Sequence, residues 1–582
     1  MVFSISASRT REIPPRRWAS AAVGRIVLAA VSNIHPAATT RRIATRETRA
    51  RRMRERRMAK YCPSKAGDLL QQGLGKHGRR IRQCTLLGMV ALITASCGGD
   101  SWFGASKSAG RVDYMAGFRG GVAADEPRAA MVARDILQNG GSAADAVAAA
   151  ALTYAVTYPN GAGLGAGGVC VASDVALKKA ETIEFPALPG KDGGPIPIPA
   201  LVRGIGLLQG KYGRLRWEAI VAPAEQLARF GEATSRAFIQ AAVEVQPPVT
   251  SSPGLRPLFT SPSGGLIAQE GERRVQPALA SVLSRLRLTG PGEFYTGALA
   301  RQVHADIVAA GGKVTLEELN TYAVAVNKPI EIPFENSVVL YTPNTPAGGA
   351  VAAWLVEQTY DGGSFLRSSN LFGSGDSVRD DTFAASLGQA YRSDPATLPM
   401  NSFGSASIAA IDRNGGTVAC AFTMGLAYGS RLVGRETGIL FAAPPGVGGD
   451  ERPYLTAMIG TMPRINQAVF ATGASGGAPA AAAAAYSVLH TALGKDKKDP
   501  TLSALAQPRM FQANPQSPLL VEPGMDPANY KAMQQRGVTV NEMGQLGRVN
   551  MAYCGEGAPR DLTTCSFAND RRGFGLSFGR NY

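Results

Sequence analysis

Histidine is nearly absent from this sequence, with four among 582 residues. His35 and His77 lie in a basic N-terminal segment. His304 and His490 lie in helical patterns, where a place on the helix surface is the simpler interpretation. Two isolated histidines give poor support to a Ser-His-Asp triad or to a metal site built from several histidines. The sequence therefore predicts neither a triad nor a bound metal.

Acidic residues are scarce in the first part of the chain. The formal charge of the whole chain is +17, but residues 1–97 contain 20 Lys and Arg against 4 Asp and Glu. The rest is close to neutral, so the folded part has no charge excess that would steer it to an anionic polymer. Because no nucleic-acid motif and no internal repeat occur either, we predict no nucleic-acid partner.

The N-terminal region lacks an apolar run long enough for a transmembrane helix. CTLLGMVALI (84–93) is too short, since a membrane-spanning helix needs roughly 20 apolar residues. It follows the basic stretch KHGRRIRQ (76–83) and precedes small residues, a pattern typical of a bacterial export signal. The end, TASC, resembles a lipobox with Thr94 where Leu is usual. We therefore expect a periplasmic protein or an outer-membrane lipoprotein attached to the membrane only through a lipid on Cys97, with a plain secretory signal as the alternative.

These features divide the segment that precedes the folded part into three regions. We expect a basic extension or mis-assigned start at 1–57, the export signal with its lipobox-like end at 58–97, and a tether at 98–120.

Cysteine is also sparse, and no CxxC or Cys/His cluster suggests zinc among the seven cysteines. Cys554 and Cys565 flank the polar loop GEGAPRDLTT and could pair in an oxidising periplasm. Cys170 and Cys420 lie inside predicted strands, where we expect them to be small buried hydrophobic residues.

Helical patterns and Gly-rich, Ala/Val-rich strand patterns alternate in the folded part, which predicts layers of helix and sheet. PRAAMVARDILQ (127–138) is helical, and Ser142 with Asp145 predicts a capping box for a helix through about Val156. Further helices are expected at 203–212, 216–230, 234–242, 294–312, 316–322, 347–360, 380–391 and 479–493, and further strands at 338–344 and 468–480.

The stretch GAGLGAGGVCVAS (161–173) formally satisfies GxGxxG. Its glycines follow a helix and precede a strand, which is the reverse of a dinucleotide site. We therefore predict no dinucleotide cofactor, and we interpret Gly163, Gly165 and Gly168 as points of tight backbone packing between layers.

Residues 405–423, SASIAAIDRNGGTVACAFT, form a predicted β-hairpin. Asn414-Gly415 between two strand-like runs is a strong hairpin signal, because a type I′ turn needs positive φ at both central residues. Pairing of the strands would place Ser405, at the start of the first, close to Thr423, at the end of the second.

Such a hairpin could carry chemistry that needs no histidine. If the peptide bond before a Ser is cut, the Ser gains an α-amine with a pKa near 8, which can act as general base for its own hydroxyl. A neighbouring hydroxyl can hold the nucleophile, and Gly476-Gly477 within TGASGGA could offer backbone N–H groups to an oxyanion. Taken alone, Ser405 is more simply interpreted as a polar residue that enters a strand.

The sequence from about residue 121 to the C-terminus resembles the gamma-glutamyltransferases, which are N-terminal-nucleophile hydrolases. The resemblance rests on ADEPRAAMVARDILQNGGSAADAVAAAALTYAVTYPNGAGLGAGGVCV and on blocks at 199–231, 293–324 and 342–357. It continues in YGSRLVGRETGILF (428–441), TGASGGA (472–478) and ALAQPRMF (504–511).

The resemblance implies an α+β fold, a four-layer αββα sandwich, and self-cleavage into two associated subunits. An ungapped match of IDRNGGTV to the family's hairpin puts the nucleophile on Ser405, the Thr that contacts it on Thr423, and the oxyanion glycines on Gly476 and Gly477. The large subunit would then be 121–404 and the small subunit 405–582. Ser402 and Ser407 are the other serines near the cut. No cofactor is implied.

Departures from the family concern the substrate. The nucleophile is Ser where the family has Thr, which resembles the related penicillin acylases. The Arg that grips the glutamyl carboxylate falls on Pro186, and the family's acidic patch falls on the uncharged stretch 441–446. The Asn after the second Thr is Gly425.

Three functions remain open from the sequence. The leading expectation is an exported enzyme that cleaves itself before Ser405 and hydrolyses or transfers a gamma-glutamyl-like acyl group from a small amide or peptide. The alternatives are an acylase for a non-glutamyl amide and a catalytically degenerate lipoprotein that serves in binding or envelope structure.

Overall fold

The computed structural model describes residues 119–360 and 404–579, with Leu387 and Ala390 between them. Short gaps fall at 175–177, 246–247, 262–263, 266–267, 335–336, 345–346, 446–453, 495, 497 and 536. The predicted leader, nearly all of the tether, Ser402 and most of the predicted helix 380–391 lie outside the described residues. Within the described ranges, no helix is long and apolar enough to span a bilayer.

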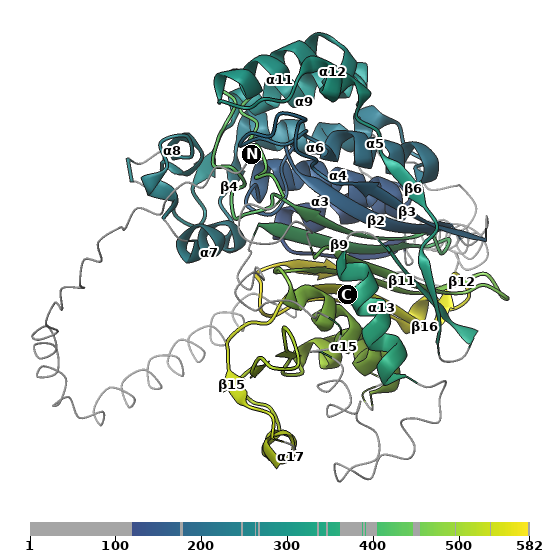
Figure 1. Ribbon diagram of the computed structural model, residues 1–582. Helices are drawn as coiled ribbons and strands as arrows, with labels where there is room; N and C mark the ends of the chain where they lie inside the picture. The colour runs from purple at the N-terminus through teal and green to yellow at the C-terminus, as the bar shows by residue number, and fades with distance from the viewer. Residues whose placement is uncertain are drawn as a thin grey trace, which may run out of the picture. The chain divides into compact units, whose positions relative to one another are not determined.

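Two antiparallel sheets lie against each other between helices (Figure 1). The first sheet has seven strands in the order β18 (Leu576–Phe578), β1 (Gly120–Ala124), β9 (Ser405–Asp412), β10 (Thr417–Thr423), β2 (Gly167–Asp174), β3 (Lys179–Phe185) and β6 (Ala325–Asn327). The second has six, in the order β17 (Cys565–Asn569), β16 (Arg548–Ala558), β12 (Gln467–Ser475), β11 (Thr456–Met462), β8 (Val339–Thr342) and β7 (Ile330–Pro333).

Helices cover the outer face of each sheet. On the first sheet, α4 (Ala143–Thr157) and α5 (Leu201–Tyr212) contact strands directly, and α6 (Trp217–Phe230) and α9 (Pro277–Thr289) continue this layer outward. On the second sheet, α13 (Ala347–Thr359), α15 (Pro479–Leu493) and α16 (Pro500–Ala506) contact strands directly. The first layer contains α3 (Pro127–Gln138), α4 (Ala143–Thr157), α5 (Leu201–Tyr212), α6 (Trp217–Phe230), α9 (Pro277–Thr289), α10 (Glu293–Thr296), α11 (Ala298–Ala309) and α12 (Leu316–Thr321). The second contains α13 (Ala347–Thr359), α15 (Pro479–Leu493) and α16 (Pro500–Ala506).

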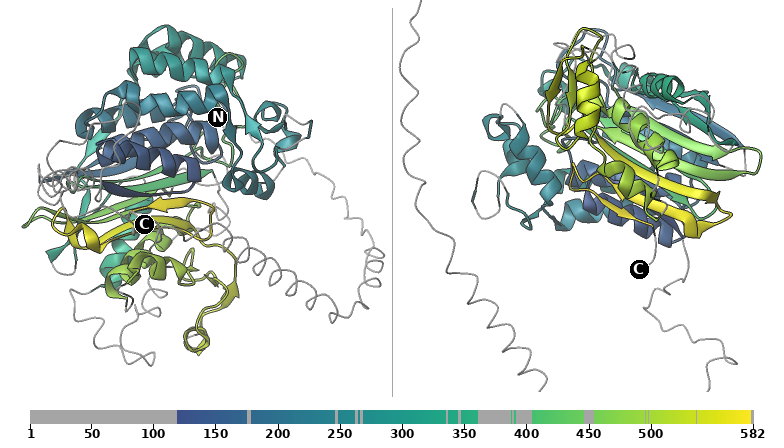
Figure 2. Two further views of the ribbon diagram at one scale, coloured as in Figure 1. Left: turned by 180° about the vertical axis from the view of Figure 1, so that it is seen from behind. Right: turned by 90° about the horizontal axis from the view of Figure 1, so that it is seen from below.

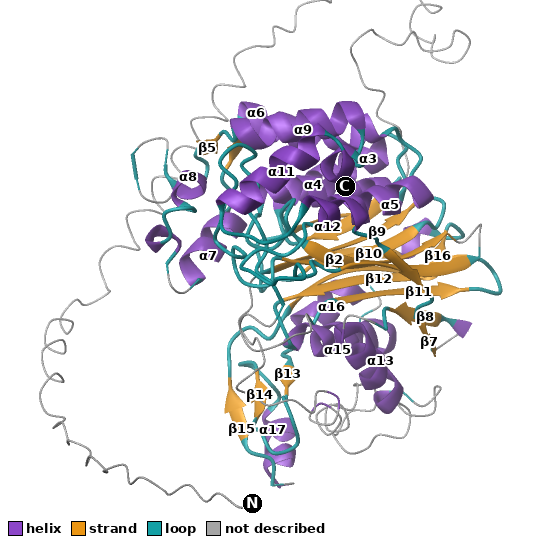
Figure 3. Cartoon of the chain, turned by 45° about the horizontal axis from the view of Figure 1, so that its top comes forward, coloured by secondary structure: helices purple, strands orange, loops and turns teal. Residues whose placement is uncertain are grey.

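The view from behind shows the same stack of helix, sheet, sheet and helix (Figure 2). The predicted four-layer αββα sandwich is therefore confirmed. Smaller elements lie around it: β4 (Glu232–Ala233), α7 (Arg236–Glu244), η1 (Val249–Ser251), α8 (Arg256–Phe259), β5 (Arg273–Arg274) and η5 (Leu562–Thr564). A projecting arm contains β13 (Met510–Phe511), β14 (Leu519–Val521), α17 (Pro527–Gln535) and β15 (Val540–Glu542) (Figure 3).

Small side chains fill the space between the two sheets. Ala409 and Ala419 of the first sheet and Ala457, Ala471 and Ala552 of the second are wholly buried and belong to one cluster. A Cβ on Gly473 would lie 2.9 Å from the Cys420 carbonyl oxygen. The Ala- and Gly-rich strand sequences therefore allow the inner faces of the sheets to approach each other closely.

Several local predictions are confirmed. Ser142 and Asp145 form the expected capping box at the start of α4. A Cβ on Gly165 would lie 2.5 Å from the Leu440 carbonyl oxygen, and one on Gly168 would lie 2.9 Å from the Ala421 carbonyl oxygen. Gly165 and Gly168 therefore serve close packing of backbone segments. Gly168, however, packs against the neighbouring strand β10 of its own sheet and not between layers, and a Cβ on Gly163 would meet no atom closer than 3.5 Å. The predicted helix at 294–312 is divided into α10 and α11.

The hairpin turn differs from the prediction. Gly415 has a φ of +84°, but Asn414 is not among the residues with positive φ. The Gly415 N–H donates to the Asp412 carbonyl at 3.0 Å, and Asp412 Oδ1 accepts from the Asn414 and Gly416 N–H groups at 2.8 and 3.0 Å. Because the Asp412 carboxylate organises this turn, one left-handed residue suffices where a type I′ turn would need two.

The prediction for the strand cysteines was wrong in one respect. Cys170 and Cys420 are wholly buried, as expected, but they form a disulfide between β2 and β10. Cys554 and Cys565 also form a disulfide, which confirms the pairing expected for them. In both cases the two residues are direct cross-strand partners, and this places their side chains on one face of the sheet.

Candidate active site

Ser405 and Thr423 face each other across the open end of the hairpin. Ser405 is the first residue of β9, Thr423 is the last residue of β10, and the two are direct cross-strand partners. Ser405 is 6% exposed. The predicted register of the hairpin is thus found in the structure, and it places the Gly404–Ser405 peptide bond where the first sheet ends.

A backbone N–H from the second sheet points at the Ser405 hydroxyl. Gly476 follows β12, and its N–H donates to Ser405 Oγ at 2.9 Å. Gly476 and Gly477 have φ values of +106° and +79°, which other residues rarely adopt. The two strands that carry Ser405 and Gly476 belong to different sheets, so the stacking of the sheets creates this contact.

The Gly404 carbonyl, which belongs to the peptide bond before Ser405, also has two donors. Thr423 Oγ1 donates to it at 3.0 Å, and the Met424 N–H donates at 2.7 Å. The Gly425 N–H donates to Thr423 Oγ1 at 2.9 Å, so the hydroxyl proton is directed to the carbonyl. The sequence predicts that Thr423 holds the Ser405 hydroxyl; in the uncut chain the Thr423 hydroxyl instead polarises the carbonyl that Ser405 would attack.

A buried cation lies on the other side of Ser405. Arg548, the first residue of β16, donates to the Ser405 carbonyl at 3.3 Å and to the Tyr158 hydroxyl at 2.8 Å. Burial alone would lower the pKa of Arg548, but Tyr158 and Asp125 raise it above its ordinary value. The guanidinium therefore keeps its charge beside the start of β9.

Asp125 connects the two sheets behind the site. This buried carboxylate, just after β1, accepts from the Ser407 N–H at 2.8 Å, from Ser475 Oγ at 2.8 Å and from Asn550 Nδ2 at 2.8 Å. Ser407 is two residues from Ser405, and Ser475 precedes Gly476. Because Asp125 holds both neighbours, it fixes the distance between the Ser405 hydroxyl and the Gly476 N–H.

Ser407 is the other described serine near the expected cleavage site, and its surroundings differ from those of Ser405. Ser407 is wholly buried inside the sheet, and Asn550 Nδ2 donates to its hydroxyl at 2.9 Å. Ser405 stands at the end of its strand with the polarised carbonyl of Gly404 beside it. The geometry therefore favours Ser405, as the ungapped match did.

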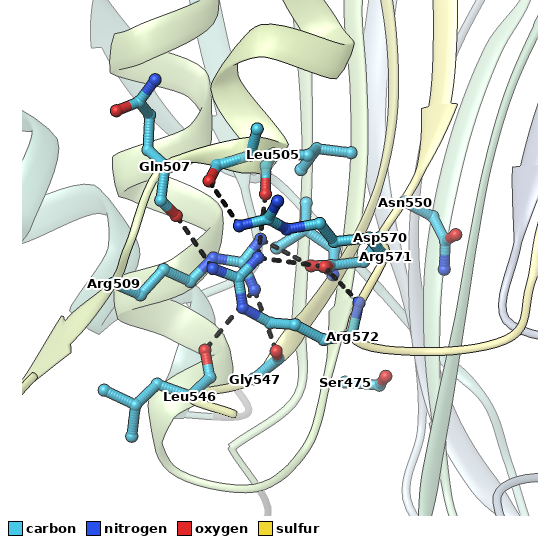
Figure 4. Close-up of polar contacts among 12 residues, drawn as sticks. Ser475, Leu505, Gln507, Arg509, Leu546, Gly547, Asn550, Asp570, Arg571 and Arg572 are labelled. Carbon is cyan, nitrogen blue, oxygen red and sulfur yellow. Dashed lines mark hydrogen bonds and ion pairs between the residues drawn. The ribbon is translucent and has the colours of Figure 1, made fainter. Parts of the chain in front are cut away.

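An ion-pair cluster supports Gly547, the residue just before β16 and Arg548 (Figure 4). Arg509 is 1% exposed, pairs with Asp570 at 2.5 Å and donates to the Gly547 carbonyl at 2.9 Å. Arg572 pairs with Asp570 at 3.1 Å and also with Glu522. Burial alone would raise the pKa of Asp570, but Arg509 and Arg572 hold it below its ordinary value.

This cluster also bears on the oxyanion glycines. A Cβ on Gly476 would lie 3.0 Å from the Gly547 Cα, so Gly547 packs directly behind Gly476. Since Arg509 fixes the Gly547 carbonyl, the cluster holds Gly476 in place from behind. Sequence analysis missed Asp125, Arg509, Arg548 and Asp570; the one available signal was the charge of single residues at the edges of apolar strands.

The two histidines of the described part lie on helices and not on the strands that carry Ser405 and Thr423. His304 is on α11, and His490 is on α15 beside the ring of Tyr486. Among the residues that the structure describes, no group of three or more His, Cys, Asp or Glu is placed to hold a metal ion.

Comparisons with known proteins found similarity over part of the chain. The family described as Gamma-glutamyltranspeptidase matches residues 129–365. Glutathione hydrolase 7 of Homo sapiens is 31% identical over 252 residues, which are 41% of this chain and 38% of that protein. Glutathione hydrolase 3 of Arabidopsis thaliana is 28% identical over 274 residues, which are 44% of this chain and 42% of that protein. The chain thus spans less than half the length of these relatives.

Among solved structures, a cephalosporin acylase from Bacillus halodurans has a similar fold. The match has a TM-score of 0.61 and 19% sequence identity, and it covers 83% of this chain and 99% of the acylase. At this identity the likeness concerns the fold alone.

Proposed function

We propose that the chain is a divergent member of the gamma-glutamyltranspeptidase family, and that it is a self-cleaving amide hydrolase or acyltransferase with Ser405 as its nucleophile. One observation carries the proposal. The Ser405 hydroxyl accepts from the Gly476 N–H, while the adjoining Gly404 carbonyl accepts from both Thr423 and Met424. An attacking oxygen and a polarised carbonyl thus lie side by side in the uncut chain.

Self-cleavage would use this arrangement directly. Ser405 Oγ attacks the Gly404 carbonyl carbon, and the Thr423 hydroxyl and the Met424 N–H stabilise the oxyanion. The carbon–nitrogen bond breaks, and the Ser405 nitrogen takes up a proton and becomes a free amine, while Gly404 is left as an ester on Oγ. Water then hydrolyses the ester, which frees the hydroxyl and leaves Gly404 as a carboxylate.

The new terminus would then act on external amides. The α-amine of Ser405, with a pKa near 8, can accept the proton of its own hydroxyl during attack on a substrate carbonyl. The Gly476 N–H already points at this oxygen at 2.9 Å, and we assign Gly476 and Gly477 to the oxyanion of the substrate. The acyl group passes to Ser405 and then to water or to an amine.

Replacement of Thr423 by valine tests the first step. Valine has the shape of threonine but cannot donate to the Gly404 carbonyl, and loss of one oxyanion donor slows acyl transfer by about a hundredfold or more. We expect cleavage of Thr423→Val to slow by that factor on a reducing denaturing gel sampled over time after translation is stopped. Thr423→Ser keeps the donor and should cleave at close to the wild-type rate; equal rates for valine and wild type would contradict the assignment.

Two observations favour a substrate whose acyl group has no amino-acid head group. Pro186 and the uncharged stretch 441–446 occupy the positions that match the family's carboxylate-binding Arg and acidic patch. A charge-assisted hydrogen bond contributes about 1.5–3 kcal/mol, so loss of both anchors would weaken glutamyl binding by orders of magnitude. We therefore propose a non-glutamyl acyl group as the better substrate.

A matched pair of chromogenic substrates tests activity and preference together. Butyryl 4-nitroanilide has the carbon chain of gamma-glutamyl 4-nitroanilide without its amino and carboxylate groups. We expect kcat/KM for the butyryl compound to equal or exceed that for the glutamyl compound, and Ser405→Ala to reduce both rates to background. A tenfold preference for the glutamyl compound would overturn the assignment of the acyl group. Equal rates for wild type and Ser405→Ala would indicate a non-catalytic family member.

We further propose that the protein is exported and works in an oxidising compartment. The two disulfides of the described part support this, since disulfides persist mainly outside the reducing cytosol. Lipidation at Cys97 and the subunit boundaries 121–404 and 405–582 are parts of the same proposal. N-terminal sequencing of the mature protein tests the export site and the cut before Ser405 in one experiment.

A further inference from the structure

The two disulfides differ in their relation to the proposed cut. Cys170 lies in β2 and Cys420 in β10, and their sequence separation is 250 residues. The Gly404–Ser405 bond lies between them. Cys554 and Cys565 are separated by 11 residues and both follow the cut. One disulfide therefore connects the two segments that self-cleavage would create, and the other lies within the second segment.

We propose that the self-cleaved protein is a single covalent molecule, in which the Cys170–Cys420 disulfide joins the large fragment to the small one. The inference rests on the proposed self-cleavage. The bond belongs to the core of the first sheet, because Cys170 and Cys420 are direct partners in the β2–β10 ladder and both are wholly buried.

The chemistry requires an acceptor of two electrons. The thiols of Cys170 and Cys420 give up two protons and two electrons as the sulfur–sulfur bond forms, and a disulfide of an oxidase or of oxidised glutathione takes them up and becomes two thiols. Hydrolysis of the Gly404–Ser405 bond consumes one water and does not involve either sulfur. The two reactions are therefore independent, and the tether survives the cut.

The tether changes how the fragments separate. The cut leaves β9 and β10 in the small fragment, where they pair with β1 and β2 of the large fragment. Without a covalent link, fragments that separate are diluted into solution. With the link, β2 and β10 stay at a high effective concentration, so re-pairing is intramolecular and does not depend on protein concentration.

Denaturing gels with and without reductant test the proposal. Wild-type protein is purified without reductant, and its free thiols are blocked with N-ethylmaleimide. We expect one band at the position of the uncut chain without dithiothreitol and two smaller bands with it. Cys554→Ser/Cys565→Ser is the matched control, because it removes a disulfide that does not cross the cut; it should behave like wild type. Cys170→Ala/Cys420→Ala should give two bands under both conditions.

The outcomes separate this inference from the proposed function. Two bands from wild type without reductant would overturn the tether and leave self-cleavage intact. One band with reductant would overturn self-cleavage, and with it a tether between fragments. Peptide mapping of unreduced wild type does not depend on any variant folding. A linked pair of peptides containing Cys170 and Cys420 is expected, and free alkylated thiols at both positions would overturn the proposal.

Discussion

Replacement of Ser405 by alanine is expected to leave the chain uncut and to abolish amide hydrolysis. Alanine removes Oγ, the atom that accepts from the Gly476 N–H at 2.9 Å, and leaves the backbone of β9 unchanged. Loss of a catalytic nucleophile lowers kcat by about a thousandfold or more, because only substrate binding and oxyanion stabilisation remain to speed the reaction. A reducing denaturing gel measures the cut, and the chromogenic anilides measure hydrolysis.

Ser405→Thr is the matched control for this experiment. It keeps a hydroxyl at the same position and restores the residue that the family has there, so we expect it to cleave and to hydrolyse. A Ser405→Ala chain that appears as two fragments, with a new N-terminus at residue 405, would contradict the assignment of the nucleophile. Cleavage at another serine in that variant would move the site elsewhere in the chain.

Replacement of Asp125 by alanine is expected to cause the largest loss of stability among single substitutions near the site. The substitution leaves the Ser407 N–H, Ser475 Oγ and Asn550 Nδ2 without the acceptor that now bonds all three. Removal of one partner from a buried charged network costs about 3–5 kcal/mol. We expect a fall of that size in the free energy of unfolding, together with slower self-cleavage.

Two comparisons sharpen this measurement. Urea unfolding is carried out in the Ser405→Ala background, so that every sample is one uncut chain. Asp125→Asn keeps an acceptor for Ser407 and Ser475 and should lose less stability than alanine. Asp135→Ala removes an exposed carboxylate, 55% exposed and paired with Arg134, and should change the free energy by less than about 1 kcal/mol. Equal effects at positions 125 and 135 would contradict the role given to Asp125.

Asp125 also explains why the nucleophile and its donor are in register. Ser405 belongs to one sheet and Gly476 to the other, and sheets that pack through small side chains have few directional contacts of their own. A buried carboxylate that accepts from both sheets supplies such contacts, because hydrogen bonds depend on angle as well as distance. Loss of the Asp125 carboxylate should therefore slow self-cleavage even though Asp125 does not contact the Gly404–Ser405 bond.

The sequence by itself determined the local features. The capping box at Ser142, the hairpin from Ser405 to Thr423 and the glycines after β12 are encoded by residues close together in the chain. Helix capping and turn formation depend on residues only a few positions apart, so these local features could be predicted from the sequence. The resemblance to a known family then gave the four layers.

The tertiary structure determined the contacts between segments that are far apart in the sequence. Cys170 and Cys420 became partners because β2 pairs with β10, and Asp125 meets Ser475 because the two sheets stack. Strand register and sheet stacking depend on packing across the whole core, and no short stretch of sequence specifies them.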